Sequence, residues 1–324
     1  MVSRGTKISR AICCVPAALI GLVLAALPTS TIAATGFAGE FLAVGAGARA
    51  MALGNAYVAL VDDATAGYWN SAALSDVQEN TAYLMHADRF SGLLNQDFVA
   101  VALPGFSLLH GFSASLLRLG VEDIEFTTLQ DPSAALGPDN RPVVSSTETS
   151  ADYALYLSGG RRLSERLDIG VSLKGIYRTV SSFSAYGFGA DVGLRYRLAT
   201  GITLAANLRD ITTTPIIWNT DTTDRIRPSV NLGVAVTHTV GGGRTSLAIG
   251  SRAGGNAKDQ SGAELINVGI EYEYQRLALR AGLEDDRQAF GIGLRPHDRL
   301  QLDVAFLQHD ELEDSYLFSA SLEF

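Results

Sequence analysis

The sequence predicts an all-β protein: a 14-stranded antiparallel transmembrane β-barrel with a small N-terminal lumenal plug containing short helices. Three observations lead to this fold. Beyond about residue 80, apolar and polar positions alternate in runs of about ten residues. The links between these runs are alternately short and long. The chain begins like a secreted protein and ends on a strand whose last residue is Phe324.

Residues 1–34 have the three parts of a secretory signal peptide. Basic residues, among them Arg4 and Arg10, precede an uncharged apolar run at 11–27, and small residues follow up to Ala34. The apolar run has 17 residues, which is short of the roughly 20 that a membrane-spanning helix needs. We therefore expect residues 1–34 to be cleaved and the rest to be exported.

Composition narrows the possible chemistry of the mature chain. Both cysteines, Cys13 and Cys14, lie in the expected signal peptide, so we expect neither disulfides nor thiolate chemistry after cleavage. Cleavage also removes three positive charges, which takes the formal net charge from −9 to −12. Such an acidic chain gives no support for nucleic acid as a partner.

Residues 35–80 form the expected plug segment. The stretch at 41–75 is rich in Gly and Ala, does not alternate, and is too long for a linker. Asp62 or Asp63 can cap one short helix, and Asn70 or Ser71 can cap a second that runs through Leu74. Small residues would let this segment fold compactly inside a barrel.

Residues 81–324 form the expected barrel. In the run at 186–198, Tyr186, Phe188 and every second residue after them are apolar, and the intervening positions are glycine or charged. The charged side chains on such polar faces are Lys174, Arg178, Asp191, Arg195, Arg197, Arg209, Glu271, Glu273, Arg276, Arg280, Arg295 and Asp303. In a barrel these would line the lumen, and the apolar faces would contact outer-membrane lipid.

A soluble β-sandwich also alternates, so alternation alone does not separate the two folds. The signal peptide, the strand length and the aromatic residues near the strand ends favour a barrel in the outer membrane of a Gram-negative-type bacterium. The expected strands are 81–89, 96–104, 110–126, 149–160, 165–180, 184–199, 201–214, 227–240, 244–252, 263–275, 276–284, 287–295, 299–309 and 313–324. With periplasmic termini, the long links at 127–149, 218–227 and 252–264 all fall on the extracellular side.

The last strand closes the barrel by pairing with the first, so it must be complete to its final residue. Its apolar positions include Tyr316, Phe318, Leu322 and Phe324. This pattern resembles the signal by which the barrel-assembly machinery recognises outer-membrane proteins. We expect deletion of Phe324 to impair assembly; a plain edge strand is the alternative.

The sequence indicates no enzyme, metal site or cofactor. Its five histidines show neither Ser-His-acid spacing nor a two-His metal motif. One apolar group, Ile216, Ile217 and Trp218, lies near the outer end of an expected strand. It is either a membrane-interface anchor or an exposed patch for a partner or hydrophobic ligand.

The stretch "GAGARAMALGNAYVALVDDATAGYWNSAAL" resembles the N-terminal signature of the PorV/PorQ family, which belongs to the FadL-like outer-membrane barrels. Ser71 stands where the family usually has Pro, and Ala73 where it usually has Gly. The matching residues that we take as the plug signature are Gly45, Gly47, Arg49, Gly54, Asp62, Asp63, Tyr68, Trp69 and Asn70. The signature covers about 30 residues and is more specific to the superfamily than to one activity.

The resemblance implies a lumenal plug and two possible functions. PorV-like members are non-enzymatic docking or shuttle components of type IX secretion, with exported cargo and secretion-system proteins as partners. FadL-like members transport long-chain fatty acids or other hydrophobic small molecules. The closer likeness to PorV/PorQ and the charged lumen favour the docking role, with transport as the alternative.

Overall fold

The computed structural model describes residues 38–255, 265–309 and 312–324. The expected signal peptide at 1–34 lies outside the described residues. So do the first residues of the expected plug, most of the link at 252–264 and residues 310–311. No helix among the described residues is long and apolar enough to cross a membrane.

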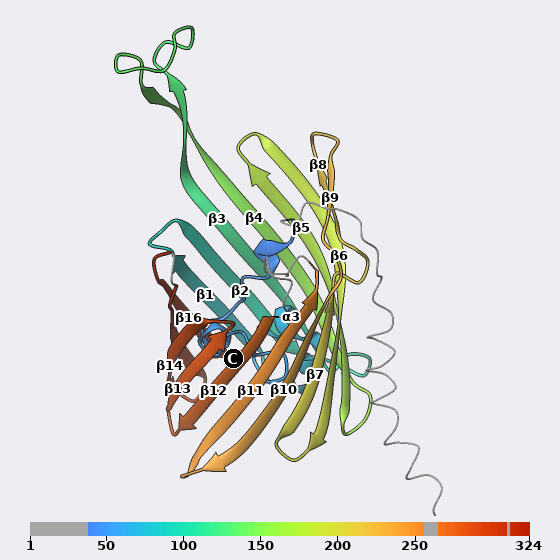
Figure 1. The fold of residues 1–324 in the computed structure, drawn as a ribbon. Coiled ribbons are helices and arrows are strands. Elements are labelled where there is room, and N and C mark those ends of the chain that lie inside the picture. Colours follow the sequence, from blue (N-terminus) through green and yellow to red (C-terminus); the bar gives the residue numbers. More distant parts are fainter. Residues whose placement is uncertain (1–37, 256–264, 310–311) are drawn as a thin grey trace, which may run out of the picture. The chain divides into compact units, whose positions relative to one another are not determined.

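Fourteen antiparallel strands form a closed barrel, as the sequence predicts (Figure 1). The strands are β1 (Thr81–Arg89), β2 (Leu94–Pro104), β3 (Gly111–Leu129), β4 (Pro142–Arg162), β5 (Leu167–Val180), β6 (Phe183–Ala199), β7 (Ile202–Arg209), β10 (Ser229–Val240), β11 (Gly243–Gly254), β12 (Leu265–Tyr274), β13 (Leu277–Glu284), β14 (Arg287–His297), β15 (Leu300–Leu307) and β16 (Ser315–Glu323). The first and last strands pair from Thr81↔Glu323 to Asp88↔Tyr316, and the β5–β6 pairing completes the ring.

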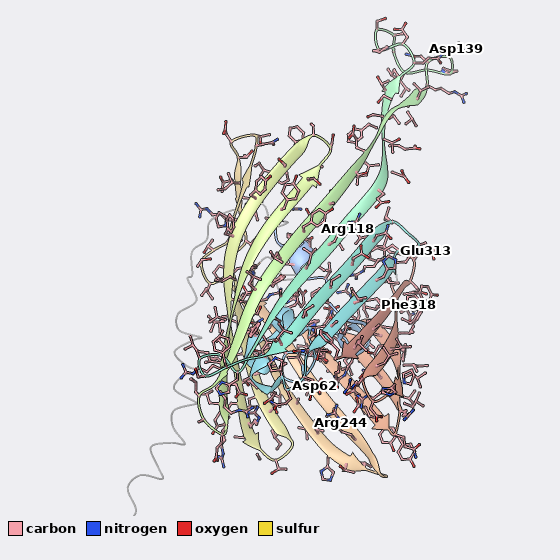
Figure 2. The ribbon with its side chains drawn as sticks, turned by 180° about the vertical axis from the view of Figure 1, so that it is seen from behind. Asp62, Arg118, Asp139, Arg244, Glu313 and Phe318 are labelled. Carbon is pink, nitrogen blue, oxygen red and sulfur yellow. The ribbon has the colours of Figure 1, made fainter. Side chains whose placement is uncertain are left out.

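The observed elements differ from the predicted ones at the extracellular side. The expected strand at 201–214 ends at Arg209, and a separate hairpin follows, formed by β8 (Pro215–Trp218) and β9 (Thr223–Arg225). β8 pairs with β6, which extends the wall locally. β3 and β4 are also longer than predicted and continue as a two-stranded arm whose tip carries Asp139 (Figures 1 and 2). Alternation does not show where a strand leaves the membrane, because an exposed ribbon alternates too.

The two faces of the wall have opposite character. In β5, Val171 and Leu173 are exposed, whereas Asp168, Ser172 and Lys174 are buried in the lumen. In a closed barrel the apolar outer face meets lipid, and no sheet edge is left unpaired within the ring. The protein is therefore an outer-membrane barrel of a Gram-negative-type bacterium, and its short turns mark the periplasmic end.

The closing strand follows the predicted pattern. Tyr316, Phe318 and Leu322 of β16 are exposed on the outer face, and Figure 2 shows Phe318 on the outside of the barrel. Leu317 points inward and is fully buried. The backbone N–H of Phe324 donates to the carbonyl of Asn80 at 2.9 Å, so pairing continues to the last residue. The role of this strand as an assembly signal stays a prediction.

The plug segment enters the lumen and folds as short helices joined by turns. These are η1 (Glu40–Leu42), α2 (Ala48–Ala52), α3 (Ala66–Trp69) and η2 (Ser71–Asp76). Nearly every residue from Phe41 to Ser75 is buried or half-buried. Helices this short are not stable alone in water, so the surrounding wall holds the segment in shape.

Candidate functional site

An aromatic cluster forms the core of the plug. The rings of Tyr57 and Tyr68 lie edge-on to Trp69, with centroid distances of 5.9 and 5.2 Å. The Tyr68 hydroxyl donates to the carbonyl of Leu42 at 2.8 Å, and Trp69 Nε1 donates to that of Ala46 at 2.7 Å. The signature aromatics therefore bring the start of the plug segment against its end.

Asn70 joins the plug to the wall. Its Oδ1 accepts the N–H of Ala72 at 3.1 Å and caps η2, as predicted. Its Nδ2 donates to the carbonyl of Val58 at 3.3 Å and to that of Leu194 on β6 at 3.1 Å. Ser71 is the first residue of η2, and the Asn70 cap satisfies one backbone N–H of that first turn.

A charged cluster, which we call the Glu271 cluster, connects α2 to the opposite wall. Arg49 binds Glu271 on β12 through two hydrogen bonds of 2.8 and 2.9 Å, and it also pairs with Asp62. On the other side of Glu271, Arg280 Nε lies 2.6 Å from its Oε2, and Arg280 also contacts Asp303 at 2.7 Å. Glu271 is fully buried, so two guanidinium groups balance its charge within the lumen.

A second charged cluster lies where η2 meets the periplasmic ends of β4, β5 and β6. Asp76 pairs with Arg162, Arg195 and Arg197, and Arg195 also binds the buried Asp168. Burial raises the pKa of Asp76, but the positive charges of Arg195, Arg197 and Arg162 outweigh it and lower the pKa below its ordinary value. The Asp76 pairs are therefore intact at neutral pH and are lost only as the pH falls through that lowered pKa.

The remaining signature residues shape the plug's turns. Gly45 and Gly47 have φ angles of 88° and 94°, a region that favours glycine. The Gly47 N–H contacts the sulfur of Met85 at 3.0 Å. Asp63 accepts hydrogen bonds from the Tyr57 hydroxyl and the Thr65 N–H, both at 2.8 Å. Asp62 lies near Arg244 at the periplasmic end, 3.6 Å away (Figure 2).

Glycines in the wall allow the plug to approach closely. A Cβ atom on Gly282 of β13 would lie 2.1 Å from the backbone nitrogen of Gly54, the signature glycine after α2. On the other side, a Cβ on Gly170 of β5 would lie 2.2 Å from the carbonyl carbon of Ser71. Lumen-facing glycine therefore provides room for the plug where a side chain would collide with its backbone.

We predict that Gly282→Ala displaces α2 and destabilises the barrel by about 1–3 kcal/mol, the usual cost of overpacking. Stability would be measured by urea titration, with folded and unfolded forms separated by their mobility in gels run without heating. Gly175→Ala on β5 is the matched control, because its new Cβ would meet only Phe188, at 4.0 Å. Equal midpoints for the two variants would show that the close approach at Gly282 is unimportant.

Two of the cavities formed by the described residues lie near opposite ends of the strands. The periplasmic one, about 420 Å³, is lined by residues such as Thr81, Glu273 and Arg299. The outer one, about 560 Å³, is bounded by the start of the plug and by strand ends and turns that include Arg89, Arg209 and Glu284. Volumes of roughly 300–1,000 Å³ are typical of small-molecule sites. The outer cavity is thus the candidate binding site nearest the exterior.

The predicted apolar patch is not a single exposed surface. Ile217 is exposed, but Ile216 is fully buried against the inner side of β6. The Trp218 indole donates to Asp224 at 2.9 Å, and its ring lies 5.8 Å from the guanidinium of Arg178. β8 pairs with β6 and so forms part of the barrel wall, which places the Ile216 side chain on the inner face. Ile216 therefore adds nothing to an exposed surface, and a role of this group as a membrane anchor or as a patch for a partner or ligand stays a prediction.

Most of the charged residues predicted to line the lumen do so, including Lys174, Asp191, Arg195, Arg209 and Arg280. Arg276 does not, because it lies in the turn between β12 and β13.

Arg89 is not among the residues that the sequence predicts for the site, although it is buried and lines the outer cavity. The alternation of β1 is the signal that indicates its position, because Arg89 follows Ala87 by two residues and so lies on the same inner face. Within residues 38–255, 265–309 and 312–324, no group of acidic, His or Cys side chains gathers to hold a metal ion.

Comparison with known proteins identifies the fold. No protein-family model and no curated protein matches the chain. The solved structure of the P. putida toluene transporter TodX is similar, with a TM-score of 0.58 and 15% identity over 86% of this chain and 99% of that one. The CymD monoaromatic hydrocarbon channel has a TM-score of 0.55 and 11% identity over 87% and 98%. These likenesses support the barrel fold alone, and neither bears on the PorV/PorQ family.

Proposed function

We propose that the protein is an outer-membrane channel for hydrophobic or amphipathic small molecules, with the plug as its gate. The observation that carries this proposal is the outer cavity above the plug, which combines a small-molecule volume with an apolar patch of Leu42, Val44 and Ile226 among charged lining residues. The fold likeness to hydrocarbon channels supports transport more than the docking role that the signature first favoured.

The contacts between plug and wall support a gate. A plug held by apolar packing alone would resist movement, because interiors pack densely. Here the Glu271 cluster and the Asp76 pairs are polar contacts, and water entering the lumen can replace them. The plug borders both cavities, with Arg49 of α2 at the periplasmic one and Leu42 and Val44 at the outer one, so passage between them would require the plug to shift.

The test is uptake of radiolabelled toluene by Gram-negative cells whose intact lipopolysaccharide makes the outer membrane a barrier. We expect cells that express the chain to take up toluene several-fold faster than cells that express an unrelated barrel. Uptake of arabinose, a hydrophilic solute of similar size, should not change. Equal toluene uptake in both strains would refute transport of hydrophobic molecules.

Docking of exported proteins, the PorV/PorQ-like function, is the second candidate, and the arm formed by β3 and β4 favours it. The arm exposes Phe126, Val143 and Val144, and Leu136 lies exposed in its tip. Exposed apolar groups on a projecting ribbon are typical of protein contacts. Deleting residues 124–147 separates the two functions: a channel keeps its toluene uptake, whereas a docking protein loses surface delivery of its cargo.

A further inference from the structure

The outer cavity has two buried arginines that pair with no carboxylate within ion-pair distance among the described residues, Arg89 of β1 and Arg209 of β7. Arg89 donates through one terminal nitrogen to Gln96 at 3.1 Å and to the Val44 carbonyl at 3.3 Å, and its Nε–H meets no acceptor in the described part of the chain. From that same part, Arg209 has a single long hydrogen bond of 3.5 Å, to the Tyr156 hydroxyl, and its guanidinium lies over the Tyr68 ring, 4.8 Å from the centroid. Buried cations with unused donors are costly unless an anion completes them.

The acidic residues that line the same cavity are engaged elsewhere or lie at its rim. Asp210 contacts Lys174 at 2.7 Å, and Glu284 accepts from Asn55 at 3.0 Å. Glu40, Asp285 and Asp286 are exposed. The buried Arg89 and Arg209 therefore supply positive charge in the interior of the cavity, whereas its mouth carries both signs of charge, because Arg287 is exposed there near Glu284.

We propose that the outer cavity binds a small organic acid as its monoanion, with the carboxylate at Arg89 and Arg209 and a compact apolar body against Leu42, Val44 and Ile226. Guanidinium groups match carboxylates through paired, charge-assisted hydrogen bonds. This inference rests on the proposed transport function and names its substrate class. A neutral hydrocarbon can contact the same apolar residues but cannot complete the hydrogen bonds of the two arginines, so it should bind more weakly than the acid.

The same arginines connect the ligand to the plug. Arg89 contacts Val44 directly, and its partner Gln96 donates to the Gly45 carbonyl at 2.7 Å. Tyr68, beneath Arg209, hydrogen-bonds to Leu42 and accepts the Gly45 N–H at 3.1 Å. A carboxylate that draws the Arg89 guanidinium toward itself competes with its hydrogen bond to the Val44 carbonyl, one of the contacts that hold the segment 42–45. Binding therefore loosens the outer end of the plug.

The experiment is calorimetric titration of the purified full chain in a neutral detergent. Benzoate is the probe, and benzyl alcohol has the same ring without the charge. We expect saturable benzoate binding at least about tenfold tighter than that of benzyl alcohol or inorganic phosphate. Equal affinity for benzoate and benzyl alcohol would overturn the proposal. If phosphate bound as tightly as benzoate, the claim that the ligand needs an apolar body would be refuted.

Arginine variants test the site itself. Arg89→Gln and Arg209→Gln should each weaken benzoate binding about tenfold or more. Arg166→Gln, on the exposed periplasmic turn between β4 and β5, should leave it unchanged. The mobility of each variant in gels run without heating shows whether it is folded. If Arg209→Gln does not fold, the benzoate affinity of Arg89→Gln alone tests the site. Unchanged affinity in folded Arg89→Gln refutes the site. Toluene uptake no faster than in cells with the unrelated barrel refutes the transport function separately.

Discussion

Glu271→Gln is expected to lower the free energy of unfolding by about 3 kcal/mol. This is a large effect for a substitution that removes a charge and leaves the size of the side chain almost unchanged. Removing the partner of buried charges costs roughly 3–5 kcal/mol, because the remaining charge is left without compensation. Here Arg49 and Arg280 both lose a carboxylate that is fully buried between them. Asp62 and Asp303 still pair with those arginines, so the lower end of the range applies.

Glu273→Gln is the control, two residues along the same strand. Glu273 pairs with Arg244 at 2.8 Å, but the Arg244 side chain is 44% exposed, so that pair contributes at most about 1 kcal/mol. Urea titration of both variants measures the difference. The double variant Arg49→Gln/Glu271→Gln should cost less than the sum of the single changes, because the two side chains interact directly. Equal midpoints for Glu271→Gln and Glu273→Gln would show that the Glu271 cluster does not hold the plug.

The barrel could be predicted closely because alternation is a local property. Each strand shows in its own sequence which face meets lipid, as Val171 and Leu173 do on β5. The link lengths then fix the order of the strands without any information on distant contacts. β8 escaped prediction for the same reason, since its inward-facing Ile216 depends on pairing with β6 and not on its own four residues.

The site was only partly predictable, because its pairs join distant parts of the chain. The signature identified Arg49 as a plug residue, and the polar face placed Glu271 in the lumen, but 222 residues separate them. Nothing in the sequence shows which lumenal charge meets which plug residue. The same holds for Asn70 and Leu194, which lie 124 residues apart. Such contacts depend on the register of the whole barrel and on how the plug turns within it.

Deleting residues 41–75 is expected to leave a folded barrel that conducts ions at least about tenfold better than the full chain. The wall closes through its own backbone pairs, β1 with β16 and β5 with β6, and none of these involves the deleted segment. Barrels without a plug leave an aqueous channel, in which lumenal charges are hydrated. Planar-bilayer recordings measure the conductance. Deleting residues 124–147, in the exposed arm, is the control and should change it little.

If the shortened chain never folds, the plug is part of the folding unit and the gate model fails. If it folds, the first prediction gains a second test. Arg49 is absent from the plugless barrel and water reaches Arg280, so Glu271→Gln should then cost less than about 1 kcal/mol. A cost that stays near 3 kcal/mol would show that Glu271 stabilises the barrel through its contacts within the wall, such as that with Arg280. A cost that falls would show that burial beneath the plug makes this carboxylate important, and that plug and wall stabilise each other through it.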